Sequence, residues 1–136
     1  MAKYIYPAVF TPEEDGYTIT FPDLESCYTQ GDNLQDAYDM AQDVLCLILY
    51  HSEEDGKPIP KASDPKAIQA DSDSFVTLIS CDTIEYRKFF DNKAVKKTLS
   101  IPSWLNSMAE QQGVNFSATL QSALKEQLHV EDRDRL

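Results

Sequence analysis

The strongest constraint on this chain lies in residues 93–130, which are too few to bury a hydrophobic core alone. Apolar and polar residues alternate through much of Val95–Ile101, and this alternation predicts a strand. Apolar residues at helical spacing then predict helices over Ser103–Gln112 and Phe116–Leu128. One strand and two helices of this size need a partner to cover their apolar sides.

Residues that favour helix ends mark the borders of these two helices. Pro102 suits the first position of the first helix, and Gly113 suits the residue just after its end. Asn115 can accept a hydrogen bond from the first turn of the second helix. This strand followed by two helices resembles a ribbon-helix-helix domain, in which two copies pair their strands into an antiparallel ribbon. We therefore expect an obligate dimer, or a higher oligomer, formed through this domain.

A two-stranded ribbon fits the major groove of DNA, and its outward side chains then face the edges of the bases. The N-terminus of the second helix also offers free N–H groups to a phosphate. The DNA contacts expected from these two features are Lys96, Thr98, Ser100, Asn115, Phe116 and Ser117. The residues expected to form the dimer core are Leu99, Ile101, Leu105, Leu120 and Leu124.

Two other interpretations of this region remain open. Residues 95–101 could form only an edge strand of a sheet built by the preceding part of the chain. The two helices could instead form a helix-turn-helix, with Ser117, Gln121 and Lys125 on the recognition helix. We favour the ribbon, because that helix would carry a single basic residue and the strand and Pro102 would have no role.

The first 81 residues predict a separate α+β domain with the element order β-β-β-α-β. In Gly16–Phe21, Tyr, Ile and Phe alternate with Thr, which is typical of a half-buried strand. This strand should form a hairpin with Tyr4–Phe10, where Pro7 favours an edge position. The other predicted elements are a strand at Cys27–Gln30, a helix that begins after Gly31 and Asp32, and a strand at Phe75–Cys81.

The helix of this domain is predicted from its cap and its apolar face. Asp32 can serve as the N-cap, with Gln35 three residues later. Its last two turns, Val44–Tyr50, are apolar nearly all round, so they should be deeply buried. The expected division of the chain is a domain over residues 1–81, a partly helical linker over 82–92, a second domain over 93–130 and a frayed end over 131–136.

Charge is distributed unevenly between the two halves. The chain has a net charge of −11. Residues 1–92 hold 18 acidic and 6 basic residues, a net charge of −12, whereas residues 93–136 hold 5 and 6, a net charge of +1. The acidic part should repel nucleic acid and attract a basic partner, although the same charge could serve solubility alone.

Several short motifs between residues 4 and 50 resemble the signature of the HicB family of antitoxins. A Tyr-x-Ala strand leads to Gly-Tyr, Phe-Pro-Asp-Leu and a cysteine, and Thr-x-Gly-Asp then precedes a helix rich in alanine. The positions that carry this resemblance are Tyr6, Ala8, Gly16, Tyr17, Phe21, Pro22, Asp23, Leu24, Cys27, Thr29, Gly31, Asp32, Ala37 and Ala41. Ser26 departs from the pattern, because a glycine commonly precedes the cysteine.

The resemblance implies a partially degraded RNase H-like fold for the N-terminal domain and a HicA-type toxin as its partner. HicA proteins are small basic ribonucleases, which agrees with the acidic charge of this domain. HicB proteins carry either of two kinds of DNA-binding tail. We therefore expect an antitoxin that neutralises its toxin and, as a dimer, represses its own operon by binding operator DNA.

No motif in the sequence points clearly to catalysis or to metal binding. Asp15, Asp23 and Asp32 could hold a divalent metal in an RNase H-like site, but each also suits a turn, a loop or a helix cap. His51 and His129 have no cysteine or histidine at ligand spacing. We therefore expect no enzyme activity, metal or cofactor. The alternatives are a residual metal-dependent nuclease and a transcription factor with an N-terminal sensor domain.

Cysteine usage and hydropathy favour a cytoplasmic protein. Cys27, Cys46 and Cys81 are few and widely spaced, as expected for reduced thiols. No signal peptide is evident at the N-terminus, and the apolar run Val44–Tyr50 is too short to span a bilayer. We expect no membrane association.

Overall fold

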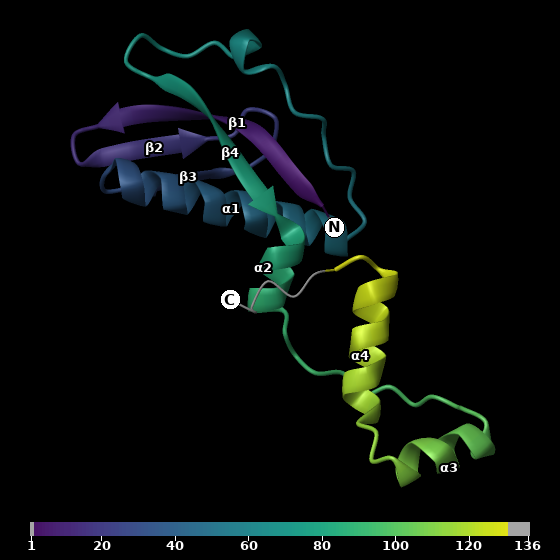
Figure 1. Cartoon of the computed structure of the whole chain (residues 1–136). Helices are drawn as coiled ribbons and strands as arrows, with labels where there is room; N and C mark the ends of the chain where they lie inside the picture. Colours follow the sequence, from purple (N-terminus) through teal and green to yellow (C-terminus); the bar gives the residue numbers. More distant parts are fainter. Residues whose placement is uncertain (1, 131–136) are drawn as a thin grey trace. The chain divides into compact units, whose positions relative to one another are not determined.

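The computed structural model describes residues 2–130 and divides the chain into two compact units, residues 1–94 and 95–136 (Figure 1). The first unit combines an antiparallel sheet with helices, so the predicted α+β class is confirmed. The second unit contains helices only among its described residues. The frayed end expected over residues 131–136 lies outside the described part of the chain.

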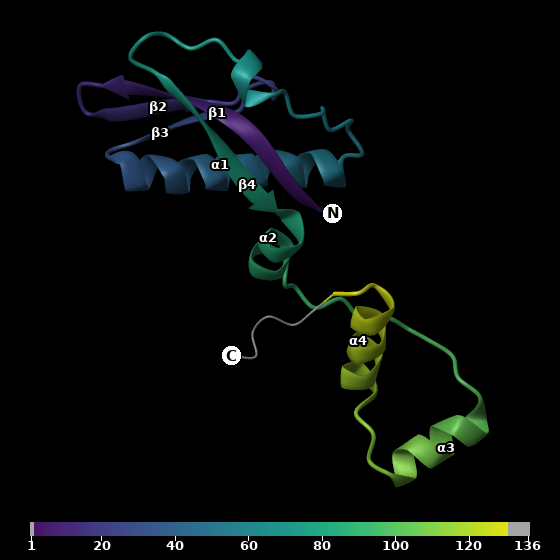
Figure 2. The same ribbon diagram turned by 45° about the horizontal axis from the view of Figure 1, so that its top comes forward.

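Four antiparallel strands form the sheet of the first unit, in the order β3-β2-β1-β4 (Figure 2). The strands are β1 (Lys3–Glu13), β2 (Gly16–Thr20), β3 (Tyr28–Gly31) and β4 (Phe75–Asp82). Phe10 of β1 is paired with Ile19 of β2 on one side and with Phe75 of β4 on the other. Tyr6, Ala8 and Phe10 occupy every second position of β1 and are buried on the face that packs on the core, and Pro7 between them is buried as well.

Pro7 lies in an interior strand, so the prediction of an edge position for Tyr4–Phe10 is wrong for the strand as a whole. Strand β1 pairs with β4 from Lys3 to Phe10, but it pairs with β2 only from Val9 onward. Pro7 therefore lies where β1 has a neighbour on one side only. Its missing N–H takes no bond away from β2, which explains why a proline is tolerated there.

Helix α1 (Leu34–Glu54) covers one face of the sheet (Figures 1 and 2). Its N-cap is Asn33, whose Oδ1 accepts a hydrogen bond from the backbone N–H of Asp36 at 2.8 Å. The prediction of Asp32 as the cap is therefore wrong by one residue. Asp32 instead donates its backbone N–H to the carboxylate of Asp36 at 2.9 Å, so Asp36 reaches back over the start of the helix.

Small residues let α1 pack closely on the sheet. Ala37 and Ala41 are fully buried. A Cβ atom on Gly31 would lie 2.4 Å from the Cα atom of Ala37, so β3 and α1 can approach this closely only with glycine at that position. Leu45 and Leu49 continue the same buried face toward the end of the helix.

The C-terminal half of α1 is less buried than the sequence predicts. Within Val44–Tyr50, Leu45, Cys46 and Leu49 are buried, whereas the side chain of Leu47 is 41% exposed. The expectation that these turns are deeply buried is therefore wrong. The reason is that one sheet covers only one side of a helix, and nothing in the described part of the first unit covers the other apolar side fully.

Helix α2 (Thr83–Phe90) follows β4 directly and packs on α1. Residues 82–92, a linker in the sequence-based prediction, thus contain a docked helix and fall within the first unit. The segment between α1 and β4 contains only the short 3-10 helix η1 (Pro65–Ala67). Residues 91–102 have no regular secondary structure and lead into the second unit.

The second unit holds the two helices that the sequence predicts, α3 (Ser103–Gln111) and α4 (Phe116–Gln127). Between them, Gly113 adopts a left-handed φ of 66°, and its N–H donates to the carbonyl oxygen of Glu110 at 3.1 Å. Asn115 caps α4 as predicted, because its Oδ1 accepts from the backbone N–H of Ala118 at 3.0 Å. Pro102 is the N-cap of α3 and not its first helical residue.

The strand predicted at Val95–Ile101 is not formed in the single described chain, where this segment has no regular secondary structure. A strand needs a neighbour for its backbone hydrogen bonds, and the ribbon model takes that neighbour from a second copy. The ribbon-helix-helix and RNase H-like parts of the fold prediction therefore stay predictions.

Candidate functional site

The second unit leaves its large apolar side chains exposed. Among residues 95–130, no position is fully buried. Four of the five residues expected in the dimer core, namely Leu99, Ile101, Leu105 and Leu124, are between 41% and 58% exposed. Leu120, the fifth, is partly buried. Exposed apolar sides on two amphipathic helices are what the prediction of a partner for this region leads one to expect, and the dimer itself stays a prediction.

The residues expected to contact DNA fall into two groups, and all of them are exposed. The first group lies in the irregular segment before α3 and comprises Lys96, Thr98 and Ser100. The second group lies at the N-terminus of α4 and comprises Asn115, Phe116 and Ser117. The single chain does not arrange the first group on a ribbon, so their contacts with DNA stay a prediction.

The three carboxylates considered for a metal site are not brought together. Asp15 and Asp32 line one hollow at the turn between β1 and β2, whereas Asp23 lines a different one. Within residues 2–130, no group of three or more His, Cys, Asp or Glu side chains is placed to hold a metal ion.

Asp23 has a structural role in the first unit. Its carboxylate accepts hydrogen bonds from the backbone N–H of Ser63, at 2.9 Å, and from the Ser63 hydroxyl. The hydroxyl of Tyr6 donates to the carbonyl oxygen of Pro60 in the same connection. These bonds attach the polar segment between α1 and β4 to the sheet and to the turn after β2.

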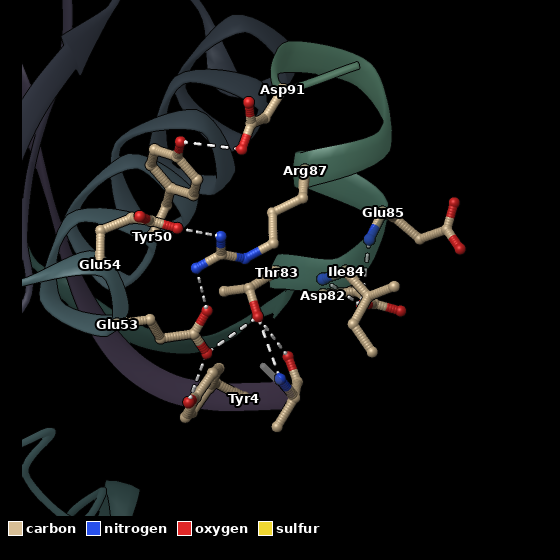
Figure 3. A network of polar contacts seen from close by, with 11 residues as sticks. Tyr4, Tyr50, Glu53, Glu54, Asp82, Thr83, Ile84, Glu85, Arg87 and Asp91 are labelled. Carbon is tan, nitrogen blue, oxygen red and sulfur yellow. Dashed lines mark hydrogen bonds and ion pairs between the residues drawn. The ribbon is translucent and has the colours of Figure 1, made fainter. Parts of the chain in front are cut away.

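A network of polar contacts holds α2 against the C-terminal end of α1 (Figure 3). Arg87 of α2 forms an ion pair with Glu53 at 3.1 Å and another with Glu54. The side chain of Glu53 is only 7% exposed. It also accepts hydrogen bonds from the hydroxyls of Tyr4, at 2.9 Å, and Thr83, at 3.0 Å. One carboxylate thus joins β1, α1 and α2.

The hydrogen bonds from Tyr4, Arg87 and Thr83 are among those that favour the ionised carboxylate of Glu53. Burial raises the pKa of this group, but the hydrogen bonds that it accepts outweigh burial and lower the pKa of Glu53 to about 2. Burial and the hydrogen bond to Glu53 raise the pKa of Tyr4 to about 12. Burial opposes the charge of Arg87, but its bonds to Glu54 and Glu53 raise its pKa above the usual value. The network is therefore a charged structural clamp.

Aromatic contacts extend this clamp along α2. The guanidinium of Arg87 lies 4.6 Å from the centre of the Tyr50 ring. The Tyr50 ring lies 5.3 Å from that of Tyr86, which lies 4.5 Å from that of Phe90. Tyr50 of α1 thus contacts both Arg87 and Tyr86 of α2, and Phe90 packs on Tyr86 within α2.

An apolar depression between these two helices is a site that the sequence analysis missed. We call it the α1–α2 hollow; it has a volume of about 320 Å³ and is lined by Thr29, Met40, Asp43, Val44, Leu47, Tyr86 and Phe90. The signal for it was the apolar run Val44–Tyr50, whose apolar residues occupy more than one side of the helix. Only one of those sides can face the sheet, so an apolar surface remains beside α2.

The described residues contain neither an exposed thiol nor a membrane-spanning helix. Cys27, Cys46 and Cys81 are buried and unpaired. Burial raises the pKa of Cys27 to about 11, and a hydrogen bond between the other two lowers the pKa of Cys46 and raises that of Cys81. No helix within residues 2–130 has the length and hydropathy needed to cross a bilayer.

Comparison with known proteins identifies a family. The profile described as "HicB_like antitoxin of bacterial toxin-antitoxin system" matches residues 5–78, more than half of the chain. A curated protein named "Antitoxin HicB 1", from Photorhabdus laumondii, is 41% identical over 56 residues, which are 40% of this chain and 36% of that protein. The chain thus spans about a third of the length of this relative.

Two solved structures are similar over most of the chain. "Toxin-Antitoxin complex from Streptococcus pneumoniae" is 28% identical with a TM-score of 0.59, covering 92% of this chain and 99% of that one. "Crystal structure of the Burkholderia Pseudomallei antitoxin HicB" is 20% identical with a TM-score of 0.51, covering 94% of this chain and 99% of that one. The second likeness shows the fold alone.

Proposed function

Because the chain belongs to the family of HicB-like antitoxins of bacterial toxin–antitoxin systems, we propose that it binds and neutralises a HicA-type toxin and represses its operon by binding operator DNA as a dimer. The observation that carries the toxin-binding half is the family match over residues 5–78. The net charge of −12 on residues 1–92 supports it, since an acidic domain attracts a small basic protein. We place this activity in the cytoplasm.

The chain is not an enzyme, because its relatives are antitoxins and antitoxins act by binding. Inhibition by binding agrees with the first unit, in which Asp23 lines a different hollow from Asp15 and Asp32 and holds a loop. Neutralisation then requires only that the first unit cover the surface with which the toxin binds or cleaves RNA.

The dimer and DNA-binding half of the proposal is supported by the uncovered apolar sides of α3 and α4. A second copy would bury them and give Val95–Ile101 a strand partner. Lys96, Thr98 and Ser100 would then lie on the outer face of the ribbon, opposite Leu99 and Ile101. The near-neutral charge of residues 93–136 would not repel DNA as the charge of the first unit does.

Co-expression tests the toxin-binding half. The full chain is produced together with the small basic protein encoded by the neighbouring reading frame, and the two should purify as a complex and relieve growth arrest. A transcription factor with an N-terminal sensor domain would show neither result. Failure of the neighbouring protein both to arrest growth and to bind this chain would overturn the proposed function.

Operator binding tests the other half, measured by fluorescence anisotropy at several salt concentrations. Lys96→Ala and Thr98→Ala should each weaken binding by about 1–3 kcal/mol per lost base contact, while toxin neutralisation is retained. If Lys96 contacts only phosphate, binding should fall on all sequences and the salt slope should drop by about one per contact. Unchanged DNA affinity in the double variant would favour the helix-turn-helix, in which Ser117, Gln121 and Lys125 are the residues to replace.

A further inference from the structure

The α1–α2 hollow presents apolar surface that the described fold leaves uncovered. Met40 and Leu47 lie seven residues apart on one side of α1 and are 39% and 41% exposed. Phe90 closes the other side of the hollow from α2 and is 65% exposed. Concave apolar surface lined by an aromatic ring is typical of the centre of a protein–protein interface.

Carboxylates border this apolar surface along α1. Asp43 lies within the lining, and Asp39 lies one helical turn before it on the same side of the helix. Asp43 is exposed, and the carboxylate of Asp39 accepts a hydrogen bond from the neutral side-chain amide of Gln35 at 3.2 Å. On α2 the guanidinium of Arg87 is already bound to Glu53 and Glu54, so it does not neutralise this border.

The charge of this border distinguishes between possible occupants. A second copy of the chain would bring the same carboxylates against each other, and nucleic acid would be repelled by the net charge of −12 on residues 1–92. A basic protein surface with an apolar side chain among lysines or arginines matches both the apolar centre and the acidic border.

We propose that this antitoxin binds its toxin at the α1–α2 hollow. An apolar side chain of the toxin packs against Leu47 and Phe90, and a basic side chain of the toxin pairs with Asp43. The inference rests on the proposed function and assigns the binding surface, which the sequence left undetermined. The Arg87 clamp positions α2 in the free protein, so the hollow is formed before the toxin arrives and little ordering is needed on binding.

The test uses the full chain and, as the probe, the purified basic protein from the neighbouring reading frame. Leu47→Arg places a positive charge in the apolar centre, and on the helix it can pair with Asp43 four residues earlier. Toxin binding should weaken about thirtyfold or more, the size of effect seen for a central interface residue. The matched control is Leu34→Arg, the same substitution on the same helix at a residue that is 54% exposed and outside the hollow. Its toxin affinity should stay within about twofold of the original.

A second pair of variants tests the charge without disturbing the packing. Asp43→Asn should weaken binding about three- to tenfold at low salt and make it less salt-dependent. Glu14→Gln, at an exposed turn away from the hollow, should change neither quantity. If circular dichroism shows that Leu47→Arg does not fold, the comparison of Asp43→Asn with Glu14→Gln tests the proposed binding surface by itself.

The outcomes separate this inference from the proposed function. If the unchanged chain binds the toxin and neither Leu47→Arg nor Asp43→Asn weakens binding, the hollow is not the site and the antitoxin function stands. Equal loss in Leu34→Arg and Leu47→Arg would also overturn the inference, because the effect would then not depend on the hollow. If the unchanged chain does not bind the toxin, both the inference and the proposed function are wrong.

Discussion

The stability of this protein in acid should depend on Glu53. Its carboxyl pKa falls from 4.5 to about 2 on folding, because the hydrogen bonds that it accepts outweigh its burial. A pKa difference of one unit corresponds to about 1.4 kcal/mol. The ionised carboxylate should therefore contribute about 3 kcal/mol to the free energy of unfolding at neutral pH. The side chain is only 7% exposed, so solvent screening reduces this value little.

The direction of the pH dependence follows from the lowered pKa. The stabilisation is fully present above the unfolded pKa of 4.5 and is lost as the pH falls toward 2. By pH 3, about 2 of the roughly 3 kcal/mol should be gone. The variant Glu53→Gln should therefore be about 3 kcal/mol less stable than the unchanged chain at pH 7 but only about 1 kcal/mol less stable at pH 3.

Urea unfolding at the two pH values measures this difference. All seven tyrosines lie in residues 1–94 and the single tryptophan lies outside them, so near-ultraviolet circular dichroism of tyrosine follows the first unit. Glu14→Gln, at an exposed turn, is the control and should track the unchanged chain at both pH values. A stability gap for Glu53→Gln that is equal at pH 7 and pH 3 would refute the reasoning, because the loss would then come from packing and not from charge.

Three further predictions concern packing, backbone conformation and assembly. Gly31→Ala should destabilise the first unit by about 1–3 kcal/mol in urea unfolding, because its Cβ would lie 2.4 Å from the backbone of Ala37; an unchanged midpoint would contradict the close packing of β3 on α1. Ser26→Gly should raise the melting temperature by a few degrees, since Ser26 has a left-handed φ of 57°. Glycine relieves the backbone strain at this φ, and the net gain after the larger entropy of the unfolded glycine chain is about 1 kcal/mol; a lower melting temperature would show that the serine side chain stabilises the turn. Leu120→Asp should abolish the dimer in light scattering, because it places a charge in the expected apolar core; a mutant that remains dimeric would place the dimer interface elsewhere.

Local patterns were sufficient to predict most of the secondary structure. The alternation in Gly16–Phe21 and the helical spacing in the second unit lie within short windows, so periodicity alone reveals them. The caps Gly113 and Asn115 were found for the same reason, because each acts on residues within four positions. The N-cap of α1 was misplaced by one residue, since Asp32 and Asn33 are adjacent and both are good caps.

The clamp around Arg87 could not be predicted from the sequence. Its members lie far apart in the chain, with Tyr4 in β1, Glu53 in α1 and Thr83 beside Arg87 in α2. Ion pairs carry no periodic signal, and charged residues in a polar stretch are usually solvated. The docking of α2 on α1 therefore leaves no signal in the sequence, and residues 82–92 resemble a linker.

By itself the sequence determined which segments are apolar on one side, how charge divides between the two halves, and that residues 93–130 cannot bury a core alone. These are properties of composition and short-range spacing, which do not depend on the path of the chain. The tertiary structure alone decided which apolar faces are covered. Pro7 is tolerated in an interior strand because β2 pairs with β1 only from Val9 onward. Leu47 stays exposed because the sheet covers only one side of α1, and α2, which the clamp holds beside α1, does not cover the other side fully. Whether an apolar face is buried depends on which distant segment packs against it, and no local pattern contains that information.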